Sequence, residues 1–238
     1  MISVLVIAIC FAVQWMARWS SASYQFPWAK HYIDRMQKIF AGLMQGHGLF
    51  AVFTLVLPML IAVSLVFTII YHWLGYAGYA LVSAILFWYC TDVGVLRHTS
   101  HAHMSNDLFL IAYQKIFAPL LWYVVLGPVG LALYYLVTNL YAQLPEKHYF
   151  ALMQGAMDWI PIRVLGITFA LAGNFSTVFP QWVREWVGPI IGNQKIVVAL
   201  GKLALGEDHT ERHVLGLLQR SLIIWLALVV LVGVSGWI

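Results

Sequence analysis

The apolar pattern of this chain predicts a set of membrane-crossing helices. Leu49 to Tyr71 contains no charged residue and is long enough to cross a bilayer as one helix, with Pro58 as a kink inside it. His72 to Tyr76 has the composition of a short interfacial turn, after which Ala77 to Cys90 is again uncharged. Leu222 to Ile238 forms a terminal apolar anchor. These runs predict a polytopic helical protein.

A helical hairpin is predicted around Gly127-Pro128. Proline removes a backbone donor and glycine tolerates unusual φ, so the apolar run breaks there. Leu108 to Leu126 then leads into the membrane and Val129 to Gln143 returns, although a single crossing that places Lys147 on the far side is the alternative. With the hairpin, regions 14–48, 91–107 and 144–221 share one side, and that side holds all 13 Lys and Arg residues when Lys115 and Arg163 at the membrane edges are counted with it. The positive-inside rule favours the hairpin, with that side cytoplasmic.

Other segments have patterns that fit a shallow or surface position. Met1 to Val13 is short for a span and predicts a shallow or half-inserted helix, with a tilted span as the alternative. Trp15 to Gln45 predicts an amphipathic surface helix with Phe26-Pro27 as its entry point. Val164 to Gly173 is too short an apolar run to cross, which favours a shallow or re-entrant helix, although the pattern leaves open whether residues 160–174 span or dip. Phe175 to Arg220 is a mixed segment rich in Leu, Val and Ala that predicts amphipathic helices, and its basic residues include Lys195, Lys202, Arg212 and Arg220.

Composition supports the membrane assignment and changes little else. Hydrophobic residues make up 62% of the chain and charged residues 9%, whereas soluble proteins average about 25% charged residues. We therefore predict an all-α, polytopic helical membrane protein of about four to six membrane segments, including the hairpin and one or two shallow or re-entrant helices. It forms a single integral membrane domain over 1–238, divided into 1–48, a membrane core at 49–175, an amphipathic segment at 176–221 and an anchor at 222–238. The net charge of +4 is dispersed, which argues against nucleic acid as a partner.

One polar loop concentrates metal-binding residue types. Three histidines lie between two aspartates, and imidazole nitrogens are common ligands of transition metals. Their spacing matches no zinc pattern, and on a helix the third histidine would lie away from the first. We therefore predict a polar inter-helix loop that binds no metal. The residues of this candidate loop are Asp92, Arg97, His98, His101, His103 and Asp107.

Charged residues near predicted membrane boundaries suggest a second polar site. Asp158 precedes an apolar run and is predicted to cap a helix that begins near Trp159, while Asp107 is a similar candidate cap. Arg163 enters the membrane shortly afterwards and is expected to reach the interface or pair with an acidic residue. Alternatively, Lys115, Asn139, Asp158 and Arg163 line a pocket for an anionic group such as phosphate or a lipid headgroup. No arrangement typical of nucleophilic catalysis is found, so no catalytic residue is assigned.

Several phrases of the sequence resemble a known membrane family. Phe117-Ala-Pro-Leu-Leu-Trp-Tyr123, Leu126-Gly-Pro-Val-Gly-Leu-Ala-Leu-Tyr-Tyr135, Asp158-Trp-Ile-Pro-Ile-Arg-Val164 and Phe169-Ala-Leu-Ala-Gly-Asn-Phe175 are similar, in order and spacing, to the AmpE branch of the CobD/CbiB family. The resemblance implies a Gram-negative inner-membrane protein associated with an AmpD-like amidase and with β-lactamase induction. The CobD/CbiB enzymes of this family join an aminopropanol unit to adenosylcobyric acid.

The sequence also departs from that family. Relatives carry a long charged segment with acidic and asparagine-bearing motifs where this chain has only Thr91 to Asp107, and Tyr135 stands where many relatives have arginine. These departures favour a regulatory or accessory protein without catalytic activity, linked to peptidoglycan-stress signalling or belonging to a larger membrane complex. The alternative is a CobD/CbiB-like enzyme that condenses an amphiphilic substrate. We expect the lipid bilayer as a partner, together with the amidase or complex, and no cofactor.

Overall fold

The described part of the chain is helical throughout. The computed structural model describes residues 2–17, 32, 35, 48–97, 105–143, 148–188, 190–207 and 210–235, and these residues contain no strand. The predicted all-α fold is confirmed. The elements are α1 (Ile2–Ala17), α4 (Gly48–Cys90), a 3₁₀ turn η1 (Val93–Leu96), α5 (Ser105–Ala112), a π-helical turn η2 (Tyr113–Phe117), α6 (Ala118–Gln143), α7 (His148–Ala172), α8 (Phe175–Glu185), α9 (Gln194–Leu205) and α10 (Glu211–Val234).

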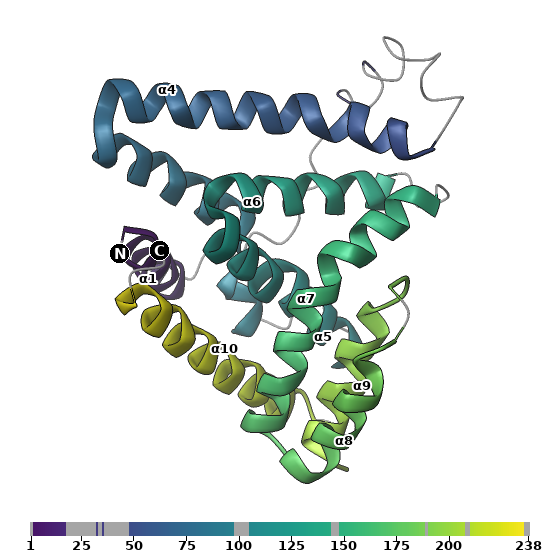
Figure 1. Cartoon of the computed structure of the whole chain (residues 1–238). Coiled ribbons are helices and arrows are strands. Elements are labelled where there is room, and N and C mark those ends of the chain that lie inside the picture. Colours follow the sequence, from purple (N-terminus) through teal and green to yellow (C-terminus); the bar gives the residue numbers. More distant parts are fainter. Residues whose placement is uncertain are drawn as a thin grey trace.

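Glycine breaks the two longest apolar helices. Gly127 in α6 has φ 67° and ψ −156°, and Gly75 in α4 has φ 64° and ψ −157°. A residue with a Cβ rarely adopts this region, so glycine lets each helix change direction abruptly. In Figure 1, α4 and α6 both turn at the end of the molecule where N and C are marked. The predicted breaks at Gly127-Pro128 and within His72–Tyr76 are therefore confirmed.

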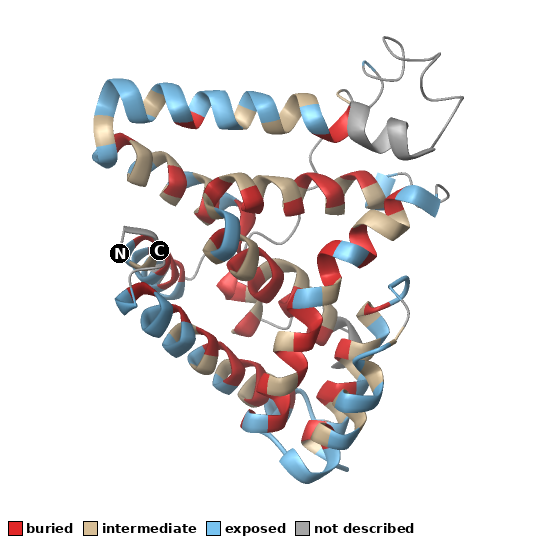
Figure 2. Cartoon of the chain, in the orientation of Figure 1, coloured by how far each residue is buried: buried red, intermediate tan, exposed pale blue. Residues whose placement is uncertain are grey.

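By length and composition, the described residues include 4 helical segments able to cross a membrane: Leu55–Cys90, Leu108–Gln143, His148–Ala172 and Glu211–Val234. The first carries more exposed large hydrophobic side chains than any of the other three, with Leu65 56% and Trp73 81% exposed. Figure 2 shows this contrast, since α4 is mostly exposed while α6 and α7 carry many buried residues. Apolar side chains on α4 are suited to lipid contact, and α6 and α7 form the interior of the bundle.

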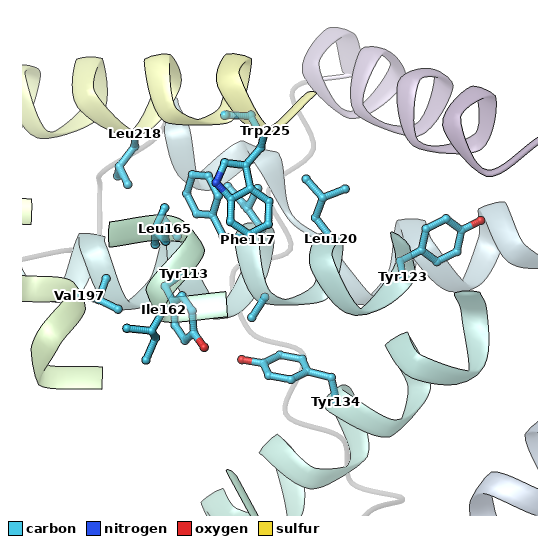
Figure 3. Close-up of a cluster of buried hydrophobic side chains, with 14 of the residues drawn as sticks. Tyr113, Phe117, Leu120, Tyr123, Tyr134, Ile162, Leu165, Val197, Leu218 and Trp225 are labelled. Carbon is cyan, nitrogen blue, oxygen red and sulfur yellow. The ribbon is translucent and has the colours of Figure 1, made fainter. Parts of the chain in front are cut away.

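Aromatic side chains fill the interior. Phe117 packs against Trp225 of α10 with ring centroids 5.4 Å apart, and Phe87 of α4 packs against Tyr123 of α6 at 4.9 Å. Figure 3 shows that this cluster draws side chains from helices far apart in sequence. Such large, fully buried rings fix the positions of α4, α6 and α10 around η2.

For residues 160–174, where the sequence left a span or a dip open, the structure favours the span. Residues 160–172 belong to α7, a continuous helix of 25 residues that begins at His148 and is long enough to cross. In the sequence, the charges of Asp158 and Arg163 indicated the edge of the membrane. In the structure, both side chains are buried in the middle of this helix. Both side chains make hydrogen bonds within the protein there, and an apolar pattern in the sequence cannot reveal those bonds.

The remaining segments refine the predicted boundaries. α1 is an apolar helix shorter than the candidate spans. α10 begins at Glu211, well before the predicted anchor at Leu222, while α8 and α9 occupy the region predicted to form amphipathic helices. Most of the surface helix predicted at Trp15 to Gln45 lies outside the described residues. Within that region, the Tyr32 hydroxyl donates a 2.7 Å hydrogen bond to the carbonyl of Leu55.

Candidate functional site

Asp158 lies at the centre of a buried hydrogen-bond network. It is 1% exposed, and both carboxylate oxygens accept hydrogen bonds. Tyr113 and Tyr134 donate to Oδ1 at 2.6 and 3.3 Å, and Gln154 and Gln194 donate to Oδ2 at 3.0 and 3.1 Å. The prediction that Asp158 caps a helix is wrong, because α7 begins ten positions earlier, at His148. Its carboxylate instead joins four parts of the fold.

The two tyrosines reach Asp158 from opposite halves of the broken apolar run. Tyr113 opens the π-helical turn η2, and Tyr134 lies in α6 beyond the Gly127 break. Figure 3 shows their hydroxyl groups pointing toward one another. A π turn adds a residue to the helical repeat and so changes the direction in which the following side chains point. The break and the π turn together bring the two hydroxyls to one carboxylate.

The two glutamines connect Asp158 to α7 and α9. Gln154 is one helical turn before Asp158 and therefore lies on the same face of α7, and Gln194 is the first residue of α9. Gln154 is 2% exposed, and its amide oxygen has no hydrogen-bond partner among the described residues. A buried amide oxygen that lacks a donor is costly, so Gln154 has an acceptor available for a bound molecule.

A cleft of about 730 Å³ opens beside this network. We call it the α7–α9 cleft. Its lining comes from α5, the end of α6, the first half of α7, the loop before α9, and α9 itself. The lining residues are Leu110, Tyr141, Ala151, Gln154, Gly155, Asp158, Ile191, Gly192, Asn193, Gln194, Lys195, Val198, Ala199 and Lys202. The cleft thus combines apolar walls with a buried carboxylate, three amides and two lysines. Its size is typical of small-molecule sites.

Arg163 fastens the far end of α8 and the following loop onto α7. Its guanidinium donates to the carbonyls of Glu185 and Trp186 at 3.1 and 3.3 Å. These carbonyls lie at the C-terminus of α8, where the helix itself supplies no further N–H donors. The arginine supplies donors instead and therefore caps the helix. The guanidinium also lies 4.4 Å from the ring centroid of Trp159. Arg163 was expected to reach the interface or pair with an acidic residue; it stays in the interior, where these carbonyl contacts and the ring hold it and the opposite charge of Glu185 lies nearby.

Asn193 connects the arginine to the cleft. Its side-chain oxygen accepts from Arg163 at 3.4 Å, and its amide nitrogen donates to the carbonyl of Gly155 at 3.2 Å. Only glycine fits at position 155, because a Cβ there would lie 2.3 Å from the carbonyl oxygen of Ile190. The loop before α9 therefore sits directly on α7, and Asp158 and Arg163 hold it from two sides.

The structure separates the four residues predicted to form one pocket. Asp158 lines the α7–α9 cleft, whereas Lys115, Asn139 and Arg163 do not. The Asn139 amide donates to the carbonyl of Tyr135 on its own helix, and the carbonyl of Lys115 accepts from the backbone of Asp92. The lysines at the cleft are Lys195 and Lys202 of α9, which the predicted pocket omitted.

The polar loop has structural contacts at its described positions. Asp92 is buried and accepts a 2.9 Å hydrogen bond from the backbone of Gly94, which caps η1. Arg97 lies 3.9 Å from the ring centroid of Trp15. His98, His101 and His103 lie outside the described residues. Asp107 belongs to the first turn of α5, which begins before it, so it is not the N-cap. Within the described ranges, no group of three or more His, Cys, Asp or Glu side chains is placed to hold a metal ion.

Sequence reasoning missed most of the residues around Asp158. Gln154 had a usable signal, because it lies four positions before Asp158 on one helix face. Tyr113, Tyr134 and Gln194 had none, since they come from other helices and one depends on a π turn. Lys195 and Lys202 were noted as part of an amphipathic segment, and only the packing of α9 onto α7 places them at a cleft.

Comparison with known proteins identifies the family. A family model described as "Regulatory signalling modulator protein AmpE" matches residues 93–235. This chain belongs to the AmpE family. The matched region contains the Asp158 network, the α7–α9 cleft and the arginine cap, so the features described above lie in the AmpE portion of the chain.

A curated relative extends the comparison to the wider family. The chain is 28% identical over 180 residues to a protein named "Cobalamin biosynthesis protein CobD" from Stutzerimonas stutzeri (strain A1501). The similarity covers 62% of this AmpE-family chain and 57% of the relative, so the chain spans little more than half the length of that protein. No solved structure matches the chain.

Proposed function

We propose that this AmpE-family protein is a regulatory or accessory component of the bacterial inner membrane, acting in β-lactamase induction and peptidoglycan-stress signalling without catalysing a reaction. The observation that carries the proposal is the state of Asp158. Both of its carboxylate oxygens are occupied by four donors, one from α7 itself and three from neighbouring elements. A carboxylate used in this way stabilises a helix arrangement and has little capacity left to bind a catalytic divalent ion.

The loop between α8 and α9 offers a surface for a protein partner. Its apolar residues are unusually exposed, with Val187 89% and Ile190 46% exposed. Arg163 and Asn193 hold this loop against α7 next to the α7–α9 cleft. A change at the cleft can therefore alter the loop, which is the coupling that a regulator needs. An AmpD-like amidase or a larger membrane complex, on the cytoplasmic side, is the partner that we propose.

Two experiments test this function. In a Gram-negative host that lacks its own AmpE-family protein, expression of the chain should change the β-lactamase level reached on exposure to an inducer. Unchanged induction with and without the chain would contradict the regulatory role. Purification of the tagged chain in a gentle detergent, followed by mass spectrometry, should recover a partner in stoichiometric amount.

The similarity to a protein named for cobalamin biosynthesis supports a second candidate. In that alternative, the chain condenses an amphiphilic substrate as a CobD/CbiB-like enzyme. The purified protein with Mg-ATP and candidate substrates should then show turnover. Turnover that disappears in Asp158→Asn while the protein stays folded would place Asp158 in an active site and replace the regulatory proposal.

A further inference from the structure

The α7–α9 cleft presents two cations on one helix face. Lys195 and Lys202 both line it and are seven residues apart on α9, which is close to two helical turns. Among the described residues, no hydrogen bond or ion pair is found for either ammonium group. Lys195 is exposed and Lys202 is half-buried. Two flexible lysines on the same face can converge on a single anionic group.

One end of the cleft lies beside the adjoining ends of two candidate membrane spans. Tyr141 is two residues from the end of α6, and Ala151 is three residues from the start of α7. Both helices belong to candidate membrane spans, so their adjoining ends lie at a membrane boundary. The apolar wall formed by Leu110, Ile191 and Val198 continues from this boundary beside the lysines.

The floor of the cleft provides an acceptor. The amide oxygen of Gln154 is buried and lacks a partner among the described residues, while the same side chain donates to Asp158. An anion alone would leave that oxygen without a donor and would also meet the Asp158 carboxylate. A molecule that carries a hydroxyl group near its anionic group satisfies both ends of the cleft, because the hydroxyl bonds Gln154 and the anion stays with the lysines.

We propose that the α7–α9 cleft binds a phosphate ester that carries a neighbouring hydroxyl group, with Lys195 and Lys202 on the phosphate and Gln154 accepting from the hydroxyl. This inference deepens the proposed function by naming the ligand class of the regulatory site. The same chemistry occurs in the headgroup of an anionic phospholipid and in a soluble phosphate ester. The apolar wall accommodates the hydrocarbon part of an amphiphile beside the headgroup.

Binding to the full chain in detergent provides the test. The probes are short-chain phosphatidylglycerol, which has the phosphate and hydroxyls, the matching phosphatidylcholine, which lacks the hydroxyls and carries no net charge, and glycerol 1-phosphate. Phosphatidylglycerol should bind saturably, and Lys195→Gln combined with Lys202→Gln should weaken that binding roughly 30-fold, about fivefold for each basic residue. Arg184→Gln removes an exposed charge on α8 outside the cleft and should leave the affinity unchanged.

The outcomes distinguish a membrane lipid from a soluble phosphate ester, and they test the ligand class separately from the regulatory function. Displacement of the lipid by glycerol 1-phosphate assigns the site to the ester group itself, whereas lipid binding without displacement assigns it to a membrane lipid. Equal binding of both lipids, or full affinity in the double lysine variant, would overturn the inference. Lysine-dependent binding with unchanged β-lactamase induction refutes the regulatory function alone. Chain-dependent induction without binding of any probe refutes the ligand class alone.

Discussion

The hydroxyl of Tyr113 donates a 2.6 Å hydrogen bond to the carboxylate of Asp158, across 45 positions of sequence. The donor lies in a π-helical turn and the acceptor in the middle of a membrane helix, and both side chains are at most 1% exposed. Burying a carboxylate is costly unless hydrogen bonds satisfy it, so this contact allows α7 to carry Asp158 through the bundle interior. It explains why α7 continues where the apolar pattern ended.

Replacement of Asp158 by alanine should strongly destabilise the protein. The change leaves Tyr113, Tyr134, Gln154 and Gln194 without their acceptor in a buried site. We expect a loss of about 3 kcal/mol or more, which exceeds the loss of a helix cap at about 0.5–2 kcal/mol. Thermal unfolding in detergent, followed by circular dichroism, measures it. Glu211→Gln, at an exposed position that starts α10, is the control, and equal midpoints for the two variants would contradict the network.

The two tyrosines should differ in importance. Tyr113 donates at 2.6 Å and Tyr134 at 3.3 Å to the same oxygen of Asp158. Tyr113→Phe should cost about 1.5–3 kcal/mol, as for a hydrogen bond to a charged group, and Tyr134→Phe should cost less. Unfolding midpoints of the two single variants and the double variant decide the order. A larger effect for Tyr134→Phe would show that the shorter contact is not the stronger one.

Replacement of Arg163 by lysine should loosen the loop between α8 and α9. A lysine ammonium has no planar fork, so it cannot hold the carbonyls of Glu185 and Trp186 together as the guanidinium does. We expect a loss of about 1–3 kcal/mol and faster proteolytic cleavage within residues 186–193. Arg184→Lys, an exposed change on α8, is the matched control. Cleavage at the same rate in both variants would show that Arg163 does not cap α8.

Alanine should be poorly tolerated at the two helix breaks. Gly75 and Gly127 have positive φ, in a region that costs other residues about 1–3 kcal/mol. Gly127→Ala and Gly75→Ala should lower the unfolding midpoint. Gly216→Ala should leave it unchanged or raise it, because Gly216 is helical and nothing lies within 4 Å of an added Cβ. If all three changes have the same effect, the breaks do not depend on glycine.

The hairpin topology predicts where introduced cysteines can be labelled. Single cysteines at positions 97, 147 and 195 should all react with an impermeant thiol reagent from the cytoplasmic side. The native Cys10 and Cys90 are buried, so background labelling should be low. Position 147 lies outside the described residues, and its side follows from the predicted return of the α6 hairpin. Labelling of position 147 from the periplasm, while position 97 labels from the cytoplasm, would replace the hairpin with a single crossing.

The sequence by itself determined the all-α class, the membrane location, and the breaks at Gly127-Pro128 and near Gly75. Each depends on local physics. An uncharged run must hydrogen-bond its own backbone in lipid, and a glycine in a turn-like segment or beside a proline favours a break in a helix. The family resemblance was also readable, because its phrases are contiguous in the chain.

Tertiary structure alone decided the path of α7 and the composition of the site. In the sequence, Asp158 and Arg163 suggested the edge of the membrane, because a local pattern treats each charged side chain as if it were buried without a partner. Their partners, such as Tyr113 and the carbonyl of Glu185, come from other elements and remove that cost. The same reason applies to Lys195 and Lys202, because a cleft exists only after α9 has packed on α7. Long-range hydrogen bonds and packing thus determined what the polar residues of this membrane protein do.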